Sequence, residues 1–257
     1  MIKEKIKFQD SCVFEGMTSI RAIIKSIDNS VSDRRIEKIL YDESKIAKIS
    51  KEIGYFKAVM DKYGFGLEAS DESELEKITL GTSHGGIVAV CSERKIPKLD
   101  GSSFIETNGF YAMIEGIEDP YNFGYALRSL YATGCSGIIL PERNWMSAAG
   151  VVCRSSAGAS ELFPIYSADP IFAVDYFKAQ NYTVVCGDLR TDKILGKCEL
   201  KKPLLLIIGG EKRGISKKLL DKCDIKVKID YSRDFSASLS AASAATMFAY
   251  EIMRQNS

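Results

Sequence analysis

The chain has 257 residues, and 35 basic against 34 acidic side chains give a net charge of +1, which offers no overall case for nucleic acid binding. No run of eighteen apolar residues occurs, and the charged start MIKEKIKFQDSC has no apolar signal region. We therefore expect a cytoplasmic protein without a membrane span.

The numbers of cysteines and histidines restrict the kinds of site that the chain can form. The seven cysteines form no CxxC pair, which favours reduced thiols and argues against a zinc ribbon or a disulfide framework. His84 is the only histidine, so neither a Ser-His-Asp triad nor a two-histidine metal site can form without it. We expect no metal site, and chemistry that uses other polar groups or a reactive cofactor.

The first hundred residues alternate short helical and strand-like segments, as in a small α/β unit. His84 stands before the last strand, in TSHGGIVAV, where a turn histidine that closes a hydrogen bond is favoured over a ligand or a base. Asp71 with Glu74 has the pattern of a capping box. The expected elements are a helix over 16–27, a strand over 36–41, a long helix over 44–63 that ends at Gly64, and a strand over 86–91.

A charged and then small, polar stretch over 94–106 has the composition of a linker, so we place the domain boundary near residue 100. This predicts a domain over 1–100 and a second over 101–257. Beyond the boundary, strand-like runs alternate with helical ones, which predicts a mostly parallel sheet with helices on both faces. Ligands of such sheets bind beyond the carboxyl ends of the strands. The expected strands are 110–114, 137–140, 182–186, 204–208 and 225–229.

The first motif, EGIEDPYNFGYALRSLYATG over 115–134, predicts a strand end, a turn at Asp119-Pro120 and a helix that ends at Gly134. Asn122 is expected to be the N-cap. Asn122 and Arg128 share the polar side of this helix with Tyr125 and Ser129, and a solvated arginine is the alternative to a functional one. The expected buried stripe is Phe123, Ala126, Leu127, Leu130 and Tyr131.

The second motif, LLLIIGGEKRGISKKLL, runs from a buried strand into a glycine loop. Ile215 stands where a phosphate loop needs lysine, and no GxGxxG is present, so nucleotide-triphosphate and dinucleotide sites are unsupported. The loop permits close approach of a ligand to the backbone, although an ordinary tight turn is the alternative. Seven basic and two acidic residues lie between Lys212 and Lys228, a patch that could track phosphates or simply be solvated.

The third motif consists almost only of serine and alanine over 236–243. Such small side chains allow backbone to pack against backbone or against a ligand. The alanine-rich continuation, with Met247, Phe248, Tyr250 and Ile252, predicts a long and mostly buried final helix.

In this order the three motifs resemble the SpoU or TrmH-type branch of the SPOUT RNA methyltransferases. The family's Asn-x-Gly-x-x-x-Arg is similar to Asn122 through Arg128, and its Gly-x-Glu-x-x-Gly loop is similar to Gly209 through Gly214. Its Ser-Leu-Asn is matched by Ser238 and Leu239 but departs at Ser240. The first domain is similar to the L30e-like RNA-binding module that precedes this catalytic domain in many relatives.

The resemblance implies a trefoil-knotted C-terminal domain, which fold rules treat as exceptional. It also implies a homodimer, S-adenosylmethionine as cofactor, and a 2′-O-methylated ribose in ribosomal or transfer RNA as product. It implies backbone and apolar cofactor contacts at Gly209, Gly210, Ile229 and Leu239, with Gly187 and Asp188 as weaker candidates.

The resemblance also implies catalytic roles. Arg128 would stabilise the developing 2′-oxyanion or orient a phosphate. It would not act as the base, because the pKa of a guanidinium is above about 12. Asn122 would fix the loop and the hydroxyl, Glu211 would organise the second loop, and Ser238 would hold Arg128 or the ribose. The alternative is a non-catalytic RNA-binding protein that retains the fold, and Ser240, a hydroxyl in place of an amide, is its best support.

Overall fold

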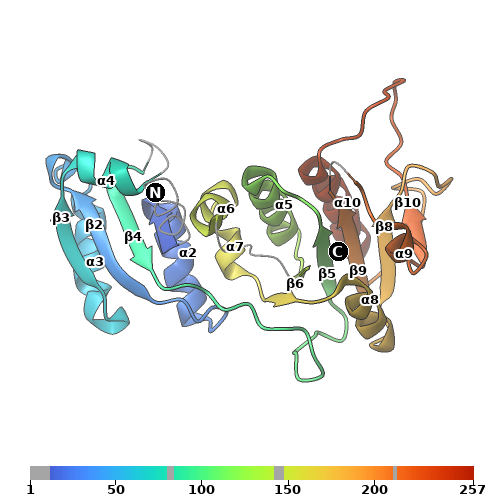
Figure 1. Ribbon diagram of the computed structural model, residues 1–257, viewed down its shortest axis with the longest axis horizontal. Helices are drawn as coiled ribbons and strands as arrows, with labels where there is room; N and C mark the ends of the chain where they lie inside the picture. The colour runs from blue at the N-terminus through green and yellow to red at the C-terminus, as the bar shows by residue number, and fades with distance from the viewer. Residues whose placement is uncertain (1–11, 80–83, 142–147, 211–212) are drawn as a thin grey trace, which may run out of the picture. The chain divides into compact units, whose positions relative to one another are not determined.

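The computed structural model describes residues 12–79, 84–141, 148–210 and 213–257, which divide between two compact units (Figure 1). The first unit comprises Met1–Lys95 and Asn144–Leu162, and the second comprises Ile96–Arg143 and Phe163–Ser257. The segment Asn144–Leu162 thus packs with the first unit, although it lies within the predicted domain 101–257. The assignment of functions to the two predicted domains stays a prediction.

A four-stranded mixed sheet forms the centre of the first unit, in the order β1-β4-β2-β3. β4 is antiparallel to β1 and β2, whereas β2 and β3 are parallel. Apolar side chains such as Phe14, Ile23 and Phe56 form its core. The strands are β1 (Val13–Glu15), β2 (Ile36–Asp42), β3 (Gly66–Ser70) and β4 (Ile87–Cys91). The helices are α2 (Gly16–Asp28), η2 (Glu43–Lys45), α3 (Ser50–Tyr63), α4 (Glu72–Ile78), α6 (Ala149–Ser155) and α7 (Ala159–Leu162).

Most predicted elements of the first unit are confirmed. The long helix expected over 44–63 is wrong at its start, because η2 and an irregular segment precede α3 at Ser50. Asp71 caps α4 by accepting a hydrogen bond from the backbone N–H of Glu74 at 2.9 Å, as its spacing predicted. β1 and β3 were not expected, since β1 has three residues and β3, GLEAS, lacks a buried face.

A six-stranded sheet forms the second unit, in the order β10-β8-β9-β5-β6-β7, and each neighbouring pair is parallel. The strands are β5 (Phe110–Glu115), β6 (Gly137–Leu140), β7 (Ile165–Ser167), β8 (Thr183–Gly187), β9 (Leu204–Gly209) and β10 (Ile225–Val227). The helices are α5 (Pro120–Ala132), α8 (Pro170–Ala179), α9 (Lys217–Leu220) and α10 (Ala241–Asn256). The mostly parallel α/β fold predicted for this half is confirmed.

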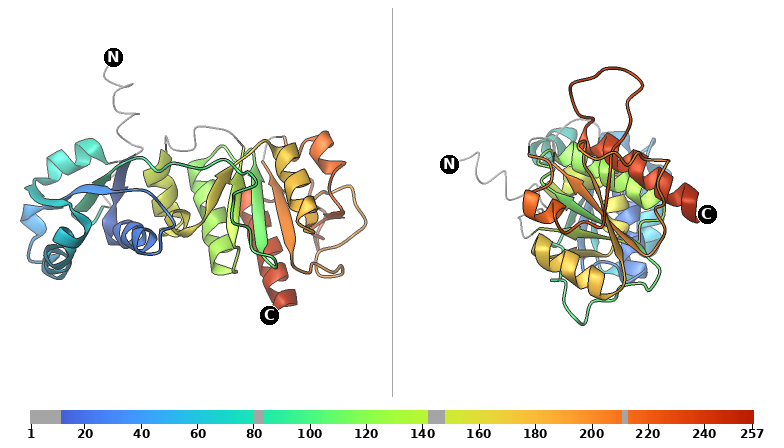
Figure 2. Two further views of the ribbon diagram at one scale, coloured as in Figure 1. Left: turned by 90° about the horizontal axis from the view of Figure 1, so that it is seen from below. Right: turned by 90° about the vertical axis from the view of Figure 1, so that its right-hand side faces the viewer.

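Helices cover both faces of this sheet (Figures 1 and 2). Tyr111 and Met113 of β5 belong to the same core cluster as Phe177 of α8, while α5 packs against α10. The central strands β5 and β9 are buried almost throughout, which explains their continuous apolar sequence. Among the described residues, no helix is both long and apolar enough to cross a membrane.

The final helix is less buried than predicted. α10 buries Phe248 and Ile252, but Met247 and Tyr250 are exposed. A helix that packs on one side buries only one stripe, and Met247 and Tyr250 lie outside the stripe that contains Phe248 and Ile252. The apolar composition of this helix therefore leaves an uncovered face.

Candidate functional site

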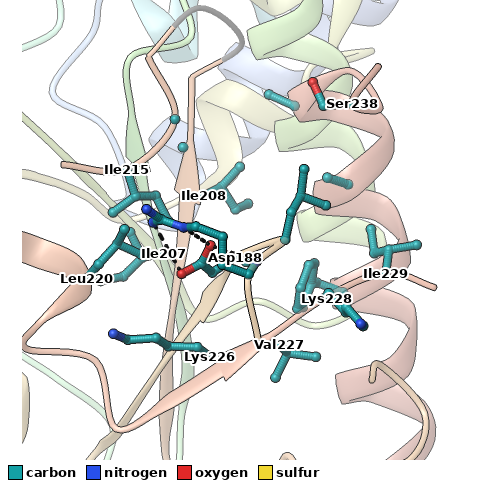
Figure 3. A pocket seen from close by; sticks show the side chains of 18 of the residues that line it. Asp188, Ile207, Ile208, Ile215, Leu220, Lys226, Val227, Lys228, Ile229 and Ser238 are labelled. Atoms are coloured by element: carbon teal, nitrogen blue, oxygen red, sulfur yellow. Dashed lines mark hydrogen bonds and ion pairs between the residues drawn. The ribbon is translucent and has the colours of Figure 1, made fainter. Parts of the chain in front are cut away.

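A cavity of about 840 Å³ opens where β8, β9 and β10 end (Figure 3). These are the carboxyl ends of parallel strands, where ligands of such sheets bind. All six residues that the resemblance assigns to the cofactor line it, together with Ser238. They are Gly187, Asp188, Gly209, Gly210, Ile229 and Leu239.

The glycine loop forms one wall and requires glycine at two positions. A Cβ on Gly210 would lie 2.2 Å from the carbonyl oxygen of Gly116, and one on Gly209 would lie 2.7 Å from the carbonyl carbon of Gly214. Gly214 closes the loop, donating its N–H to the Gly210 carbonyl at 2.9 Å, and has a φ of 62° that favours glycine. Glycine at these two positions therefore lets the loop pack closely against the backbone at Gly116 and Gly214.

The floor and the opposite wall are apolar. Ile207, Ile208 and Val227 are buried side chains that line the cavity (Figure 3). Ile229 and Leu239, which are partly buried, also line it. The Leu239 segment is fixed in place, because its N–H donates to the hydroxyl oxygen of Tyr231 at 3.2 Å. An apolar cavity with backbone polar groups at one side suits a flat heteroaromatic ring.

Charged side chains surround the mouth. Asp188 follows β8 and accepts hydrogen bonds from Nε and the backbone N–H of Arg190, at 3.0 and 3.1 Å. Burial alone would raise the pKa of Asp188, but these hydrogen bonds and the guanidinium charge hold it below its ordinary value. Asp188 is therefore ionised at neutral pH.

Helix α5 carries the first motif, and its start differs from the prediction. The N-cap is Asp119, whose side chain accepts from the backbone N–H of Asn122 at 2.9 Å, and Pro120 occupies the first turn. Asn122 lies three positions after the cap, so the expectation that it is the N-cap was wrong. A carboxylate before proline is an equally good cap, and proline fits the first helical position without losing a needed donor.

The polar and buried sides of α5 lie largely as predicted. Phe123, Ala126, Leu127 and Leu130 are buried, Tyr125 and Arg128 are exposed, and Gly134 follows the helix with a φ of 82°. Tyr131 departs from the buried stripe, because it lies in the last turn, where its exposed ring packs edge-on against Phe163. The predicted end and direction of the helix are thus confirmed.

The structure does not bring all predicted catalytic residues to the cavity. Arg128 and Asn122 lie on α5 and are not among the residues that line it, whereas Ser238 is. Glu211 lies outside the described residues. α5 is tied to the third motif's helix through the Thr246 hydroxyl, which donates to the Ser129 hydroxyl at 2.7 Å.

Ser240, where the sequence departs from the family pattern, has a clear structural role. It is the N-cap of α10, and its Oγ accepts from the backbone N–H of Ser243 at 3.1 Å. Asparagine is also a preferred N-cap residue, so either residue can cap the helix at this position.

Tyr231 and Phe248 are among the lining residues that the sequence analysis did not assign to the site. Tyr231 holds the Leu239 segment, and Phe248 packs behind Gly187, 3.4 Å from where a Cβ would stand. Phe248 could have been found from its helical spacing to Ala241 and Ala244, which also line the cavity. No pattern pointed to Tyr231, since its hydrogen bond joins residues within an irregular segment.

His84 is a turn residue, as predicted. Its ring is fully buried and its Nδ1 accepts the backbone N–H of Gly86 at 3.1 Å. Among the described residues, no group of three or more His, Cys, Asp or Glu side chains is placed to hold a metal ion.

Known proteins match this architecture. The chain superposes on the crystal structure of an RNA 2′-O ribose methyltransferase with a TM-score of 0.77 and 20% identity, covering 95% of this chain and 88% of that one. It also superposes on the SpoU methyltransferase AviRb of Streptomyces viridochromogenes in complex with AdoMet, with a TM-score of 0.75, 23% identity, and coverage of 95% and 89%. The fold is therefore that of the SPOUT methyltransferases.

The sequence places the chain within this class. The family model of the SpoU rRNA methylases matches residues 109–250, more than half of its length, and the chain belongs to that family. It is 26% identical over 234 residues to YacO of Bacillus subtilis (strain 168), described as a TrmH family tRNA/rRNA methyltransferase, covering 89% of this chain and 92% of YacO. It is also 31% identical to a TrmH family protein of Staphylococcus aureus (strain COL), although that match covers only 58% of the relative. The chain is an RNA methyltransferase of the TrmH/SpoU type.

Proposed function

We propose that the protein transfers the methyl group of S-adenosylmethionine to a ribose 2′-hydroxyl of ribosomal or transfer RNA. The observation that carries this proposal is the cavity between the glycine loop and the Leu239 segment, in a family of RNA methylases. The choice of the 2′-hydroxyl is supported by the fold shared with an RNA 2′-O ribose methyltransferase.

The cavity fits the cofactor in size and chemistry. About 840 Å³ is within the range of small-molecule sites, and the apolar floor of Ile207, Val227 and Leu239 suits an adenine ring. Gly209 and Gly210 line the cavity, and without side chains they leave backbone groups at this wall. When bound, the cofactor supplies an activated methyl group on a sulfonium.

Arg128 and Ser238 are the groups of this chain that we assign to the ribose. Arg128 is exposed and hydrogen-bonds to no described side chain or backbone group, so its guanidinium is available to a phosphate or to an oxygen that gains negative charge. A guanidinium is a poor proton acceptor, so we assign to Arg128 the stabilisation of charge and not the removal of the proton. Ser238, exposed at the cavity, can donate to or accept from a ribose hydroxyl. Asn122 and Glu211 keep the positioning roles that the resemblance implies.

We also propose that two copies pair through α5 and α10. These helices pack together and carry exposed apolar side chains, Tyr121 and Tyr125 on α5 and Met247 and Tyr250 on α10. Such groups on neighbouring helices suit a twofold contact, the commonest arrangement of homo-oligomers. Sedimentation should show a dimer that Met247→Glu weakens, while Phe172→Glu, at an exposed position on α8, leaves it intact. A monomer at micromolar concentration would contradict the pairing.

Methyl transfer from radiolabelled cofactor to total RNA tests the reaction. A 2′-O-methyl group blocks alkaline cleavage of the adjacent phosphodiester, so the label should appear in alkali-resistant dinucleotides. Label in mononucleotides would indicate base methylation and overturn the ribose assignment. Leu239→Arg provides a matched inactive variant, because a charge placed against the apolar wall lacks a partner and should abolish calorimetric binding of the cofactor. Absence of binding by the unmodified protein at millimolar cofactor would overturn the enzymatic proposal.

A further inference from the structure

The mouth of the cavity has an excess of positive charge. Five cationic side chains and two carboxylates line it, which gives the described lining a net charge of +3. The cations are Arg190, Arg213, Lys217, Lys226 and Lys228, and the carboxylates are Asp188 and Asp221. The whole chain, by contrast, has a net charge of only +1.

Most of this charge is not compensated locally. Arg190 pairs with Asp188, but Arg213, Lys217, Lys226 and Lys228 form no ion pair with any described residue. Elsewhere in the same unit, Lys178 and Lys222 pair with Asp224 and Asp175 at 2.6 and 2.5 Å. We call Arg213, Lys217, Lys226 and Lys228 the cationic rim.

Two members of the cationic rim, Lys226 and Lys228, lie in β10 or directly after it and line the cavity. Lys226 and Lys228 lie on either side of the buried Val227 (Figure 3). Their strand is at the edge of the sheet, and the Lys228 backbone is fixed by donating to the Lys193 carbonyl at 2.9 Å. Both lysines therefore lie at the carboxyl end of β10, and their side chains extend from it in opposite directions (Figure 3).

The charge of the rim, unlike the apolar lining, does not complement the proposed cofactor. S-adenosylmethionine carries a sulfonium, an ammonium and a carboxylate, so its net charge is +1, and a rim of net positive charge repels it. A polyanion is the complementary ligand, and each phosphate of RNA brings one negative charge. The apolar floor and the cationic rim thus fit different molecules.

We propose that the cationic rim binds backbone phosphates of the RNA substrate, and that RNA and S-adenosylmethionine therefore bind with positive coupling. The proposal rests on the proposed function, since it needs the cofactor in the cavity. Phosphates at the rim neutralise the charge that opposes the cofactor. By thermodynamic linkage, the cofactor must then tighten RNA binding by the same factor.

The coupling also distinguishes substrate from product. Transfer of the methyl group converts the sulfonium to a neutral thioether, so the product of the cofactor has no net charge. The rim repels this neutral product less, so RNA phosphates have less repulsion to offset. RNA should therefore raise the affinity of the product less than that of S-adenosylmethionine. Salt should act in the same direction as RNA, because it screens the repulsion in the free protein.

The test uses the full chain with Lys226→Gln/Lys228→Gln and the matched control Lys201→Gln/Lys202→Gln. The control lysines immediately precede β9 and so lie at the amino end of the sheet, away from the cavity. Bulk transfer RNA is the probe, and its affinity is measured against salt concentration. We expect the rim variant to lose about 1.4 from the slope of log affinity against log salt, since each phosphate contact to a single strand contributes about 0.7. The control should keep the wild-type slope.

Calorimetry of S-adenosylmethionine with and without RNA then measures the coupling. In the wild type at low salt, RNA should tighten the cofactor several-fold. In the rim variant, binding without RNA should equal or exceed wild type while the RNA effect shrinks, a combination that simple structural damage does not produce.

The two failures are distinguishable. An unchanged salt slope in the rim variant, or cofactor affinity that ignores RNA in the wild type, overturns the inference alone. If no cofactor binds with or without RNA, the proposed function is overturned and the coupling with it.

Discussion

The guanidinium of Arg34 and the carboxylate of Glu161 form an ion pair with an Nε–Oε2 distance of 3.0 Å, although 127 positions separate them in sequence. Both side chains are at least 96% buried. Arg34 also donates to the Ser92 carbonyl at 2.7 Å and lies over the ring of Phe14. This pair joins α7 to the segment just before β2, within the first unit, and buries Glu161 there.

Removing one partner of this pair should strongly destabilise the first unit. Glu161→Gln leaves a buried guanidinium without a counter-ion, which costs about 3–5 kcal/mol. The matched control is Glu68→Gln, which breaks the exposed Lys38–Glu68 pair of the same 3.0 Å distance and should cost about 1 kcal/mol or less. Equilibrium urea denaturation measures both, and similar losses would mean that burial does not govern the Arg34–Glu161 pair.

Glu251 should give the protein an acid-dependent stability. Hydrogen bonds from the Arg254 guanidinium, and secondarily from the Gln255 amide, lower the pKa of this carboxyl from 4.5 to about 2. The folded state thus holds its proton less tightly than the unfolded state, so the stabilisation is complete above about pH 4.5 and lost as pH falls toward 2. Glu251→Gln should remove this part of the pH dependence in thermal unfolding between pH 5 and 2. An unchanged profile would show that Glu251 does not contribute.

The two ion-paired carboxylates show the limits of prediction from sequence. Glu251 and Arg254 lie three positions apart on one helix, a spacing that local rules recognise. The pairing of Arg34 with Glu161 depends on how distant segments fold together, and no periodicity reveals it. The extension of the first unit by Asn144–Leu162 belongs to the same category.

The candidate site likewise has features that local sequence predicts and features that depend on tertiary structure. Its glycine loop and the parallel sheet could be predicted, because buried strands and small residues leave strong local patterns. The Ile229 and Leu239 positions came only from the resemblance to the family, and their role as cofactor contacts stays a prediction. The cap at Asp119 was missed because aspartate and asparagine are both good caps, and sequence alone does not decide between them. The Tyr231 hydroxyl under Leu239 depends on tertiary structure alone.

Gly210→Ala tests whether the close approach of the glycine loop matters for the cofactor. The new Cβ would lie 2.2 Å from the Gly116 carbonyl oxygen, so backbone must move at the cavity wall. We expect calorimetric affinity for S-adenosylmethionine to fall about tenfold or more, equivalent to at least about 1.4 kcal/mol. Gly101→Ala is the control, because its Cβ would meet nothing within 4 Å. Wild-type affinity in Gly210→Ala would exclude this wall from cofactor binding.

Ser240 should be replaceable by the family's asparagine without loss of stability. Ser240→Ala removes the acceptor for the Ser243 N–H and should cost about 1 kcal/mol, whereas Ser240→Asn keeps a capping oxygen and should stay within about 0.5 kcal/mol of wild type. Thermal unfolding distinguishes the two variants. If asparagine destabilises as much as alanine, the cap is not the reason that this position tolerates both residues.

Replacing Arg128 should distinguish an effect on ligand binding from an effect on the chemical step. Because Arg128 does not line the cavity, Arg128→Ala should leave calorimetric affinity for S-adenosylmethionine nearly unchanged. RNA affinity should fall only slightly, since one phosphate contact among many is lost. Turnover should fall about a hundredfold or more, the usual result of removing a donor that stabilises charge in a transition state.

Two further measurements decide the role of Arg128. Arg128→Lys should remain poorly active, because an ammonium lacks the planar fork of the guanidinium. Single-turnover methyl transfer with excess enzyme removes differences in RNA binding, so any remaining loss belongs to the chemical step. Near-normal single-turnover rates in Arg128→Ala would make Arg128 a solvated residue of α5. The assignment would then move to Ser238, the proposed catalytic residue that the structure places at the cavity.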